Sequence, residues 1–479
     1  MIMNHNMATE ASRIGFLDVQ IYENGRRSAH VDFSHTEVEY QRNPPPGVGI
    51  VQMRQWGSCT SEIGYYMGSG DVPSRFMQDS ANEHKLHQYL PRTLAAGFTS
   101  DPADIQRIMV GAPFHEGWGI IEDLLEDHQR PNVPVQMYVP TNGSGPVHLE
   151  RRIVPMNFQS GFRSGSMAVL NPAYLCDWHS SAEHIDPSTG WPEQCNRNTH
   201  PHGNLPKATR GHTEAIGTAT SGKMPMMLDS LTPIPHYLEE FILTDPLRRG
   251  ILATSLEPLA CVYQAHGPLL QRGEVPGSIA VIGDGPNSLL MMQFYQMYAP
   301  DASIVVVGKN REKLDAIQRV NPDQIRTVIT DGRAEKEGYD DLSYALSEAT
   351  GSNRADLVIP TVALPRETIE PFVKDEGMVV WWAASVSENV AEDSGSKTRP
   401  YREFHSYGGA PRAEISAAAG YEWLLKERPD ALEPLFNYPG IYHSEMSQKG
   451  ATDVQTWLNN GGRFIHPENG LSAKLVVSV

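Results

Sequence analysis

The segment SIAVIGDGPNSLLMMQFYQ, residues 278–296, most constrains the fold of this chain. It consists of an apolar run, a glycine-rich turn and a helical run, the order in which Rossmann-type sheets bind a dinucleotide pyrophosphate. Gly283 would allow the tight turn, Gly285 the close approach of a phosphate, and Ser288 close helix–strand packing. A plain turn is the alternative. The residues predicted to hold the pyrophosphate are Gly283, Gly285, Pro286, Asn287 and Ser288.

From residue 278 onward, apolar strand-like runs alternate with helical runs, and the strand-like runs include SIVVVG, IRTVIT, ADLVIPTV and MVVWWAAS. This alternation predicts an α/β domain with a doubly wound parallel sheet. The first half is rich in Pro, Gly and His with short apolar runs, which indicates β structure with long loops. We therefore predict a β-rich domain from residues 1–262 and 416–479, and a dinucleotide-binding domain at 263–415.

The end of the second predicted strand bears on which dinucleotide would bind. A cofactor with a free ribose 2′-OH calls for an acid there, but the sequence continues Gly308, Lys309, Asn310, Arg311 and offers no carboxylate. A glycine followed by basic residues suits a 2′-phosphate, so the sequence favours NADP(H) over NAD(H). The alternative is that Lys309 and Arg311 are solvated charges at the start of the next helix.

Composition excludes several classes of protein. The chain has 479 residues and a net charge of −18, which disfavours nonspecific nucleic-acid binding. No apolar run approaches the roughly 18 residues of a membrane span, and the first residues do not resemble a secretory signal. The four cysteines are scattered, which fits a reducing cytoplasm and not a disulfide scaffold.

Four dispersed residues have side chains that bind zinc: Cys59, His115, Glu116 and Glu257. Zinc takes thiolate, imidazole and carboxylate ligands, and a catalytic site keeps one position open. Cys59, His115 and Glu257 would form such a site, with Glu116 as an alternate ligand. Other interpretations stay open, because Cys59 also suits a small buried residue or a nucleophile and Glu257 suits a charge at a helix N-terminus.

A series of motifs, in chain order, resembles those of the medium-chain, zinc-containing alcohol and polyol dehydrogenases, especially their sorbitol dehydrogenase-like branch. The motifs are CTSEIGYY at 59–66, FHEGWG at 114–119, EPLACVYQAH at 257–266, the Gly-x-Gly-Pro turn, ADLVI at 355–359 and AKLVVSV at 473–479. The resemblance implies a GroES-like β-rich catalytic domain together with a Rossmann cofactor domain. It also assigns the four metal candidates to zinc-ligand or near-ligand positions.

The same resemblance implies roles for the residues that follow Cys59. Ser61 matches the hydroxyl that relays the substrate proton, and Glu62 matches the acid that hydrogen-bonds the ligating histidine. Tyr65 and Tyr66 would face the substrate pocket. With Glu116, Ser61 and Glu62 are the residues expected to support catalysis.

The chain departs from this family in two respects. The four-cysteine lobe that binds a structural zinc is absent, and the segments between the motifs are longer than usual. One inserted segment carries four further side chains that can bind a metal: Cys176, His179, Cys195 and His200. For this segment we favour a polar loop over a second zinc site. The rival motif RGHTEAIGTA lies too close to the glycine turn for the family's order, so His212 is expected to be structural.

These features together predict a zinc-dependent, NADP(H)-using oxidoreductase. It would interconvert a secondary alcohol and a ketone on a small polar substrate such as a polyol, sugar or cyclitol derivative. The resemblance implies a homodimer or homotetramer, while the net charge and the lack of a long apolar run argue against a nucleic acid or a membrane as partner. The alternatives are a redox-neutral epimerase or isomerase that retains its cofactor, and a non-catalytic nucleotide sensor or scaffold.

Overall fold

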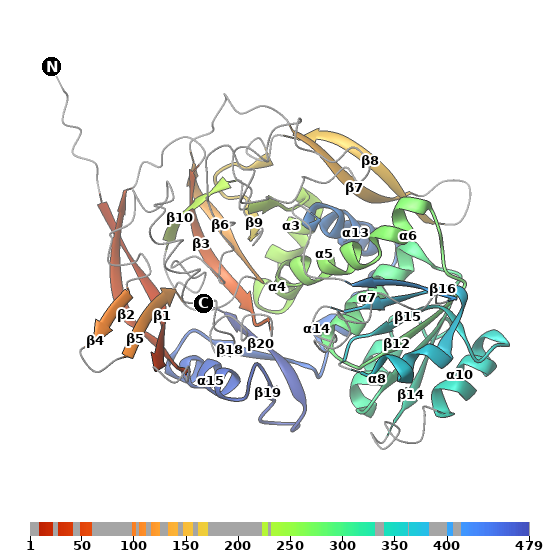
Figure 1. Cartoon of the computed structure of the whole chain (residues 1–479). Coiled ribbons are helices and arrows are strands. Elements are labelled where there is room, and N and C mark those ends of the chain that lie inside the picture. The colour runs from red at the N-terminus through yellow and green to blue at the C-terminus, as the bar shows by residue number, and fades with distance from the viewer. Residues whose placement is uncertain are drawn as a thin grey trace, which may run out of the picture. The chain divides into compact units, whose positions relative to one another are not determined.

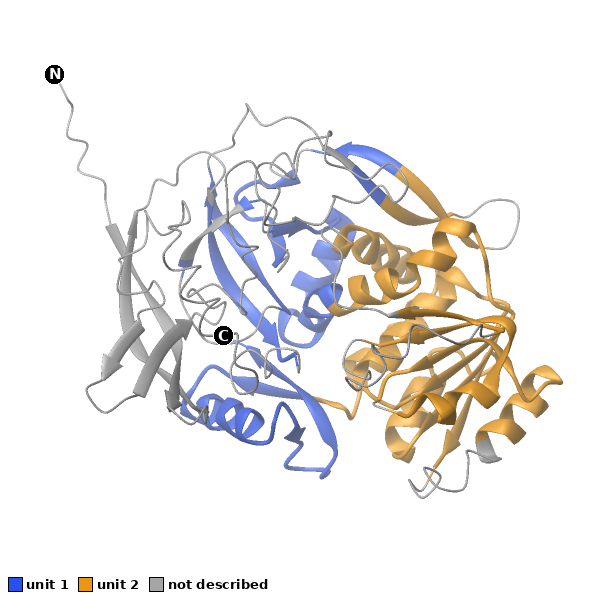
Figure 2. Cartoon of the chain, in the orientation of Figure 1, with its two compact units in different colours: residues 1–136, 153–257, 442–479 blue, residues 137–152, 258–441 orange. Residues whose placement is uncertain are grey.

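The structure is a computed structural model of the chain (Figure 1). It describes residues 9–22, 27–41, 48–59, 98–101, 105–111, 116–124, 133–141, 147–156, 161–170, 223–228, 231–330, 340–362, 364–382, 400–405 and 413–478. The chain folds into two compact units (Figure 2). Unit 1 consists of residues 1–136, 153–257 and 442–479, and unit 2 consists of residues 137–152 and 258–441. Among the described residues, no helix is long and apolar enough to cross a membrane.

Unit 2 is built on a six-stranded sheet in which all neighbouring strands run parallel. The spatial order β14-β13-β12-β15-β16-β17 is the 3-2-1-4-5-6 order of a Rossmann sheet. The central strands are apolar because helices cover both faces of such a sheet. The predicted doubly wound sheet is confirmed. Its strands are β12 (Ser278–Ile282), β13 (Ser303–Gly308), β14 (Ile325–Ile329), β15 (Ala355–Pro360), β16 (Val373–Trp381) and β17 (Arg402–His405).

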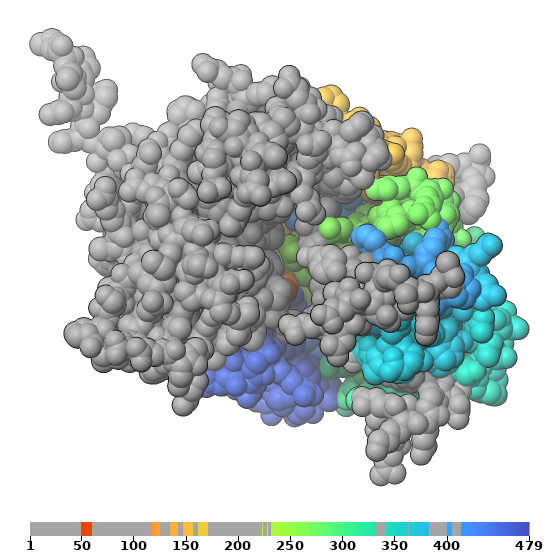
Figure 3. Space-filling model, in the orientation of Figure 1, coloured from red at the N-terminus to blue at the C-terminus, as the bar shows by residue number. Residues whose placement is uncertain are grey.

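The helices of unit 2 differ in how deeply they are buried. In α7, every residue from Ser288 to Tyr298 is buried, which explains why apolar side chains occur on all sides of this helix. In contrast, α10 exposes Tyr344, and the teal and cyan atoms of Figure 3 belong to the surface of this part of unit 2. The helices are α5 (Leu256–Ala265, which spans the unit boundary), α6 (Gly267–Arg272), α7 (Pro286–Tyr298), α8 (Arg311–Gln318), α10 (Asp340–Thr350), α11 (Arg366–Ile369), η7 (Glu370–Phe372), α13 (Glu414–Glu427), η8 (Pro429–Ala431) and α14 (Glu433–Phe436).

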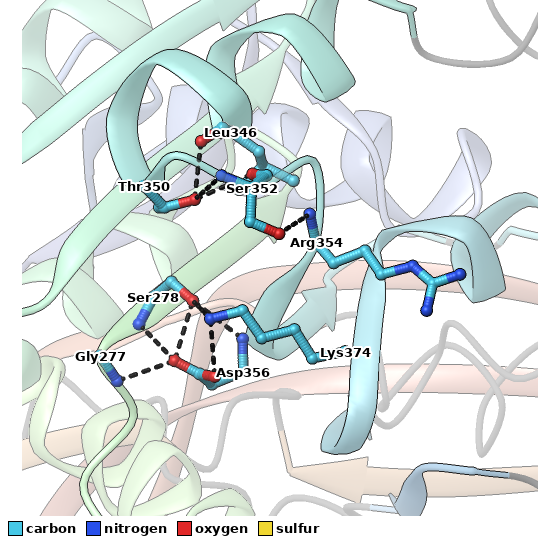
Figure 4. Close-up of polar contacts among 8 residues, drawn as sticks. All are labelled: Gly277, Ser278, Leu346, Thr350, Ser352, Arg354, Asp356 and Lys374. Carbon is cyan, nitrogen blue, oxygen red and sulfur yellow. Dashed lines mark hydrogen bonds and ion pairs between the residues drawn. The ribbon is translucent and has the colours of Figure 1, made fainter.

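A polar network ties together the starts of three parallel strands (Figure 4). Asp356 Oδ2 accepts hydrogen bonds from the backbone N–H groups of Gly277 and Ser278, at 3.0 and 2.8 Å. The ammonium of Lys374 donates to Asp356 Oδ1 at 2.9 Å and to Ser278 Oγ at 3.1 Å. Burial acts to raise the pKa of Asp356, but the hydrogen bonds from Lys374 and Ser278 hold it below its usual value. The network lies at the end of the sheet opposite to the glycine turn.

Unit 1 contains a largely antiparallel sheet of eight strands, with the path β11-β9-β6-β3-β20-β18 and with β10 on β3 and β19 on β20. The predicted C-terminal strand is confirmed as β20, which pairs with β3. The strands are β3 (Val48–Gly57), β6 (Glu116–Leu124), β9 (Met167–Leu170), β10 (Lys223–Met227), β11 (Leu231–Pro233), β18 (Ile441–Glu445), β19 (Phe464–Ile465) and β20 (Ser472–Ser478).

Among its described residues, unit 1 also contains three α-helices and a second sheet, and a two-stranded hairpin includes residues of both units. The helices are α3 (His236–Leu243), α4 (Pro246–Thr254) and α15 (Gln448–Asn459). A four-stranded sheet has the order β2-β1-β5-β4, from β1 (Thr9–Tyr22), β2 (Arg27–Gln41), β4 (Phe98–Asp101) and β5 (Ile105–Gly111). The hairpin pairs β7 (Val133–Thr141) with β8 (His148–Met156).

The compact units differ from the predicted domain boundaries. The longer segment of unit 2 runs from residue 258 to 441, whereas the predicted dinucleotide-binding domain runs from 263 to 415. The later end of this segment has a physical reason, because α13 and η8 hydrogen-bond to α7 of the Rossmann unit. Tyr421 Oη donates to Gln293 Oε1 at 3.3 Å, and Gln293 Nε2 donates to the Ala431 carbonyl at 3.1 Å.

Candidate functional site

The glycine turn after β12 has the geometry that the sequence predicted. Gly283 has a φ of +132°, a conformation that residues with a Cβ rarely adopt, and a Cβ there would collide with the Thr361 side chain. Its N–H donates to the Val307 carbonyl at 2.7 Å, which fixes the turn against β13. Ser288, in place of the usual third glycine, is fully buried and donates from Oγ to the Gly283 carbonyl at 2.8 Å.

The start of α7 fits a phosphate group. Gly285 is the N-cap of the helix and Pro286 occupies its first turn. Because glycine has no side chain, no side-chain capping hydrogen bond covers this end. A Cβ added to Gly285 would meet no atom of the described residues within 4 Å, so the space beside this residue is open to them. Backbone N–H groups and the helix dipole favour an anion there. These observations fit a dinucleotide pyrophosphate.

The end of β13 differs from the prediction in one respect, because a carboxylate does reach it. Asp284, the middle residue of the glycine turn, accepts hydrogen bonds at Oδ2 from the backbone N–H groups of Lys309 and Asn310, both at 2.7 Å. Lys309 and Arg311 are exposed, as a site for a 2′-phosphate requires. Asn310 caps α8 by accepting from the Lys313 N–H at 3.0 Å.

Two further residues hold Asp284 at this position. Gly308 leaves room for it, because a Cβ on Gly308 would lie 2.7 Å from Asp284 Oδ2. The buried Tyr438 hydroxyl donates to the Asp284 backbone carbonyl. Burial, and secondly the charge of Asp284, raise the pKa of Tyr438 well above its usual value, which keeps this donor protonated.

A separate candidate site lies in unit 1, where three elements meet around the end of β3. Gly57 pairs with Glu116 at the start of β6 and with Val476 of β20. The chain after Gly57 is held to β20 by two hydrogen bonds: Ser58 N–H donates to the Leu475 carbonyl at 2.8 Å, and the Leu475 N–H donates to Ser58 Oγ at 3.0 Å. This anchoring positions Cys59, the next residue.

An ion pair occupies the space beside Gly57. The Lys474 ammonium on β20 pairs with the Glu116 carboxylate, and their side chains are only 14% and 3% exposed. A Cβ on Gly57 would lie 2.9 Å from both Glu116 Oε2 and Lys474 Cε, so the absence of a side chain there makes room for the pair. Burial acts to lower the pKa of Lys474, but the charges of Glu116, Cys59 and Glu257 hold it above its usual value.

Three of the four predicted metal ligands, Cys59, Glu116 and Glu257, therefore favour the charged form of the buried Lys474 side chain. Cys59 is half-buried, and Glu116 and Glu257 are buried. The three do not by themselves form a cluster able to hold a metal ion, and no other such cluster occurs among the residues that the structure describes. Predicted residues outside the described part of the chain are His115, Ser61, Glu62, Tyr65, Tyr66, Cys176, His179, Cys195, His200 and His212.

Sequence reasoning missed two residues, although each left a signal. Lys474 is a lone charge in the apolar run AKLVVSV, and a lysine in a buried strand calls for a buried partner. Asp284 is an acid within the turn predicted to bind a phosphate, where a negative charge is out of place unless it is held away from that ligand. In both cases the partners lie far away in the sequence.

Solved structures share the fold of this chain, whereas no family model and no curated protein matches its sequence. Galactitol-1-phosphate dehydrogenase from Escherichia coli is 13% identical with a TM-score of 0.54, over 97% of this chain and 100% of that chain. A protein from E. coli CFT073, described as a short chain alcohol dehydrogenase and solved with NADH, is 13% identical with a TM-score of 0.52, over 97% and 100%. Glucose dehydrogenase from Haloferax mediterranei, in complex with NADP, Zn and gluconolactone, is 11% identical with a TM-score of 0.51, over 97% and 99%.

These likenesses show the class of fold. The chain has the medium-chain dehydrogenase fold, a GroES-like β-rich domain joined to a Rossmann domain, as the sequence predicted. At identities of 11–13%, a shared fold does not transfer activity or ligands. The chemistry has to be argued from the residues of this chain.

Proposed function

We propose that this chain is an oxidoreductase that uses a nicotinamide dinucleotide and zinc to interconvert a secondary alcohol and a ketone. The observation that carries the proposal is the buried ion pair of Lys474 with Glu116 beside Gly57, to which Cys59 and Glu257 add negative charge that raises the pKa of Lys474. These acids and this thiol come from distant parts of the sequence and attract one buried cation. The thiol and carboxylates suit zinc when a histidine joins them.

The proposed chemistry assigns distinct tasks to the residues of unit 1. A bound zinc ion would polarise the substrate oxygen, and a bound nicotinamide would accept or donate the hydride. Cys59, His115 and Glu257 would hold the ion, with Glu116 as a near-ligand. Lys474 neutralises Glu116 and holds its carboxylate beside Gly57.

The residues after Cys59 complete the proposal. Ser61 would take the proton of the substrate hydroxyl and pass it on, and Glu62 would hold the His115 ring by a hydrogen bond. Tyr65 and Tyr66 would line the substrate pocket with surfaces that stack on a sugar or polyol and hydroxyls that bind it.

For the dinucleotide, we propose NADP(H) as the preferred ligand, with its pyrophosphate at Gly283, Gly285 and the start of α7. The support is the open space in front of Gly285 and the exposed Lys309 and Arg311 at the end of β13. We propose a polyol, sugar or cyclitol derivative as substrate. Neighbours of the same fold include a glucose dehydrogenase and a galactitol-1-phosphate dehydrogenase.

Metal analysis of the purified chain tests the zinc part of the proposal. We expect about one zinc per chain, with loss of most of it in Cys59→Ala. Cys261→Ala is the matched control, because this second cysteine lies on α5 and is not a proposed ligand. Zinc that is absent from the wild type, or retained equally in both variants, contradicts the proposal.

A substrate panel of polyols, sugars and cyclitols tests the reaction. If the chain oxidises the substrate, the absorbance of the reduced nicotinamide should increase over time only when NADP⁺ and substrate are both present. Conversion of substrate without net cofactor reduction would instead identify a redox-neutral epimerase. Dinucleotide binding without turnover of any substrate, combined with absence of zinc, would identify a nucleotide sensor.

Assembly is a further part of the proposal. We propose a homodimer or homotetramer, because β17 ends the order of the Rossmann sheet and offers a strand edge for a second copy. Light scattering of the purified chain gives the mass, and a monomer at all concentrations would rule this assembly out.

A further inference from the structure

We infer that Asp284 is a specificity residue of the dinucleotide site, whose carboxylate opposes the 2′-phosphate of NADP(H) and keeps NAD(H) an acceptable ligand. The inference rests on the dinucleotide binding proposed above. In Rossmann sheets that select a free ribose 2′-OH, the acid follows the second strand. Here the acid comes from the glycine turn after the first strand, and it reaches the same position from the side.

The contacts of Asp284 locate its charge. One carboxylate oxygen accepts from the N–H groups of both Lys309 and Asn310, the two residues directly after β13. Ribose hydroxyls or a 2′-phosphate are bound at this end of the second strand in a Rossmann site. The carboxylate of Asp284 therefore lies where a 2′-phosphate would approach the backbone.

The position of this charge is fixed by the surrounding backbone. Gly308 is required for it, since a Cβ there would lie 2.5 Å from Asp284 Cβ and 2.7 Å from Oδ2. Tyr438 holds the Asp284 backbone from the other side through its hydroxyl. Asp284 also occupies two N–H donors that a phosphate would otherwise use.

Opposite charges thus meet at one corner of the Rossmann unit. Lys309 and Arg311 are exposed, and solvent screens their attraction for a 2′-phosphate. Asp284 is half-buried and hydrogen-bonded, so its repulsion is screened less. The basic residues favour NADP(H) and Asp284 limits that preference, so the chain should bind both dinucleotides with affinities within roughly tenfold.

Calorimetric titration of the full chain with NAD⁺ and with NADP⁺ tests this inference. We expect Asp284→Asn to shift the ratio of the two dissociation constants by about tenfold or more toward NADP⁺. Asparagine retains an oxygen that accepts from Lys309 and Asn310, so the turn should keep its shape. If thermal unfolding shows that Asp284→Asn is not folded, the same titration is carried out with Asp284→Ser.

Asp323→Asn is the matched control, because it removes one negative charge from an exposed position of the same unit between α8 and β14. It should leave the ratio unchanged. An Asp284→Asn ratio equal to that of the wild type, or an equal shift in Asp323→Asn, would overturn the inference. Failure of the wild type to bind either dinucleotide would instead overturn the proposed function.

Discussion

The glycine turn of unit 2 and the ion pair of unit 1 are built in opposite ways. The turn is continuous in sequence, and its features are backbone features: a φ of +132° at Gly283 and an open approach at Gly285. The ion pair joins Glu116 on β6 to Lys474 on β20 across a glycine of β3. The first site is determined by local conformation and the second by strand register.

This difference has an energetic consequence. The open position beside Gly285 carries little stability, so a side chain added there should leave the fold intact. A buried ion pair is different, because removal of one partner leaves an uncompensated charge in a poorly solvated place. The two sites should therefore respond differently to substitution, to pH and to ligands.

The largest expected effect comes from Lys474→Met, which leaves the Glu116 carboxylate buried without its cation. We expect a loss of about 3–5 kcal/mol in the free energy of unfolding of unit 1, measured by urea denaturation. The double variant Lys474→Met with Glu116→Gln should recover much of the loss, because no lone charge remains. A single variant as stable as the wild type would mean that the pair is not buried in solution.

The second largest expected effect is that the two units lose stability at opposite extremes of pH. Burial lowers the pKa of His266 in unit 2 to about 4, from 6.5. The unfolded chain thus binds a proton that the folded chain does not, so stability is full above 6.5 and falls by about 3 kcal/mol as the pH drops toward 4. In unit 1 the raised pKa of Lys474 gives stability that is full below 10.5 and is lost as the pH rises above it.

Hydrogen exchange of peptides from each unit, corrected for intrinsic rates, measures this contrast. Unit 2 should open first in acid and unit 1 first in alkali. His266→Gln should remove the acid response of unit 2, whereas His236→Gln, at a position 67% exposed on α3, should not. The same unit opening first at both extremes would refute the contrast.

The smallest effect on stability distinguishes two glycines of one turn. Gly283→Ala should cost about 1–3 kcal/mol, since alanine is strained at its φ and meets Thr361. Gly285→Ala should leave the unfolding midpoint unchanged but abolish dinucleotide binding, because its Cβ would fill the phosphate approach. Thermal unfolding and dinucleotide titration of both variants provide the measurement, and unimpaired binding by Gly285→Ala would contradict this location of the site.

Much of unit 2 was predictable because its signals are local. The apolar runs of β12, β13 and β15 and the Gly283 turn are short stretches whose period and composition indicate their structure. The return of the chain at residue 442 was not predictable, because it depends on α13 packing on α7 through Gln293. A helical pattern shows that a helix forms and leaves open which neighbour it packs on.

The sequence by itself determined the strand–helix alternation, the glycine turn and the candidate set that includes Cys59, Glu116 and Glu257. Only the tertiary structure decided that Glu116 pairs with Lys474, that the charges of all three raise the pKa of Lys474, and that Asp284 brings a carboxylate to the end of β13. The physical reason is the range of the interactions. Backbone conformation is set by neighbouring residues. Charges far apart in sequence meet only where strand pairing brings them together and where glycines such as Gly57 and Gly308 leave room for them.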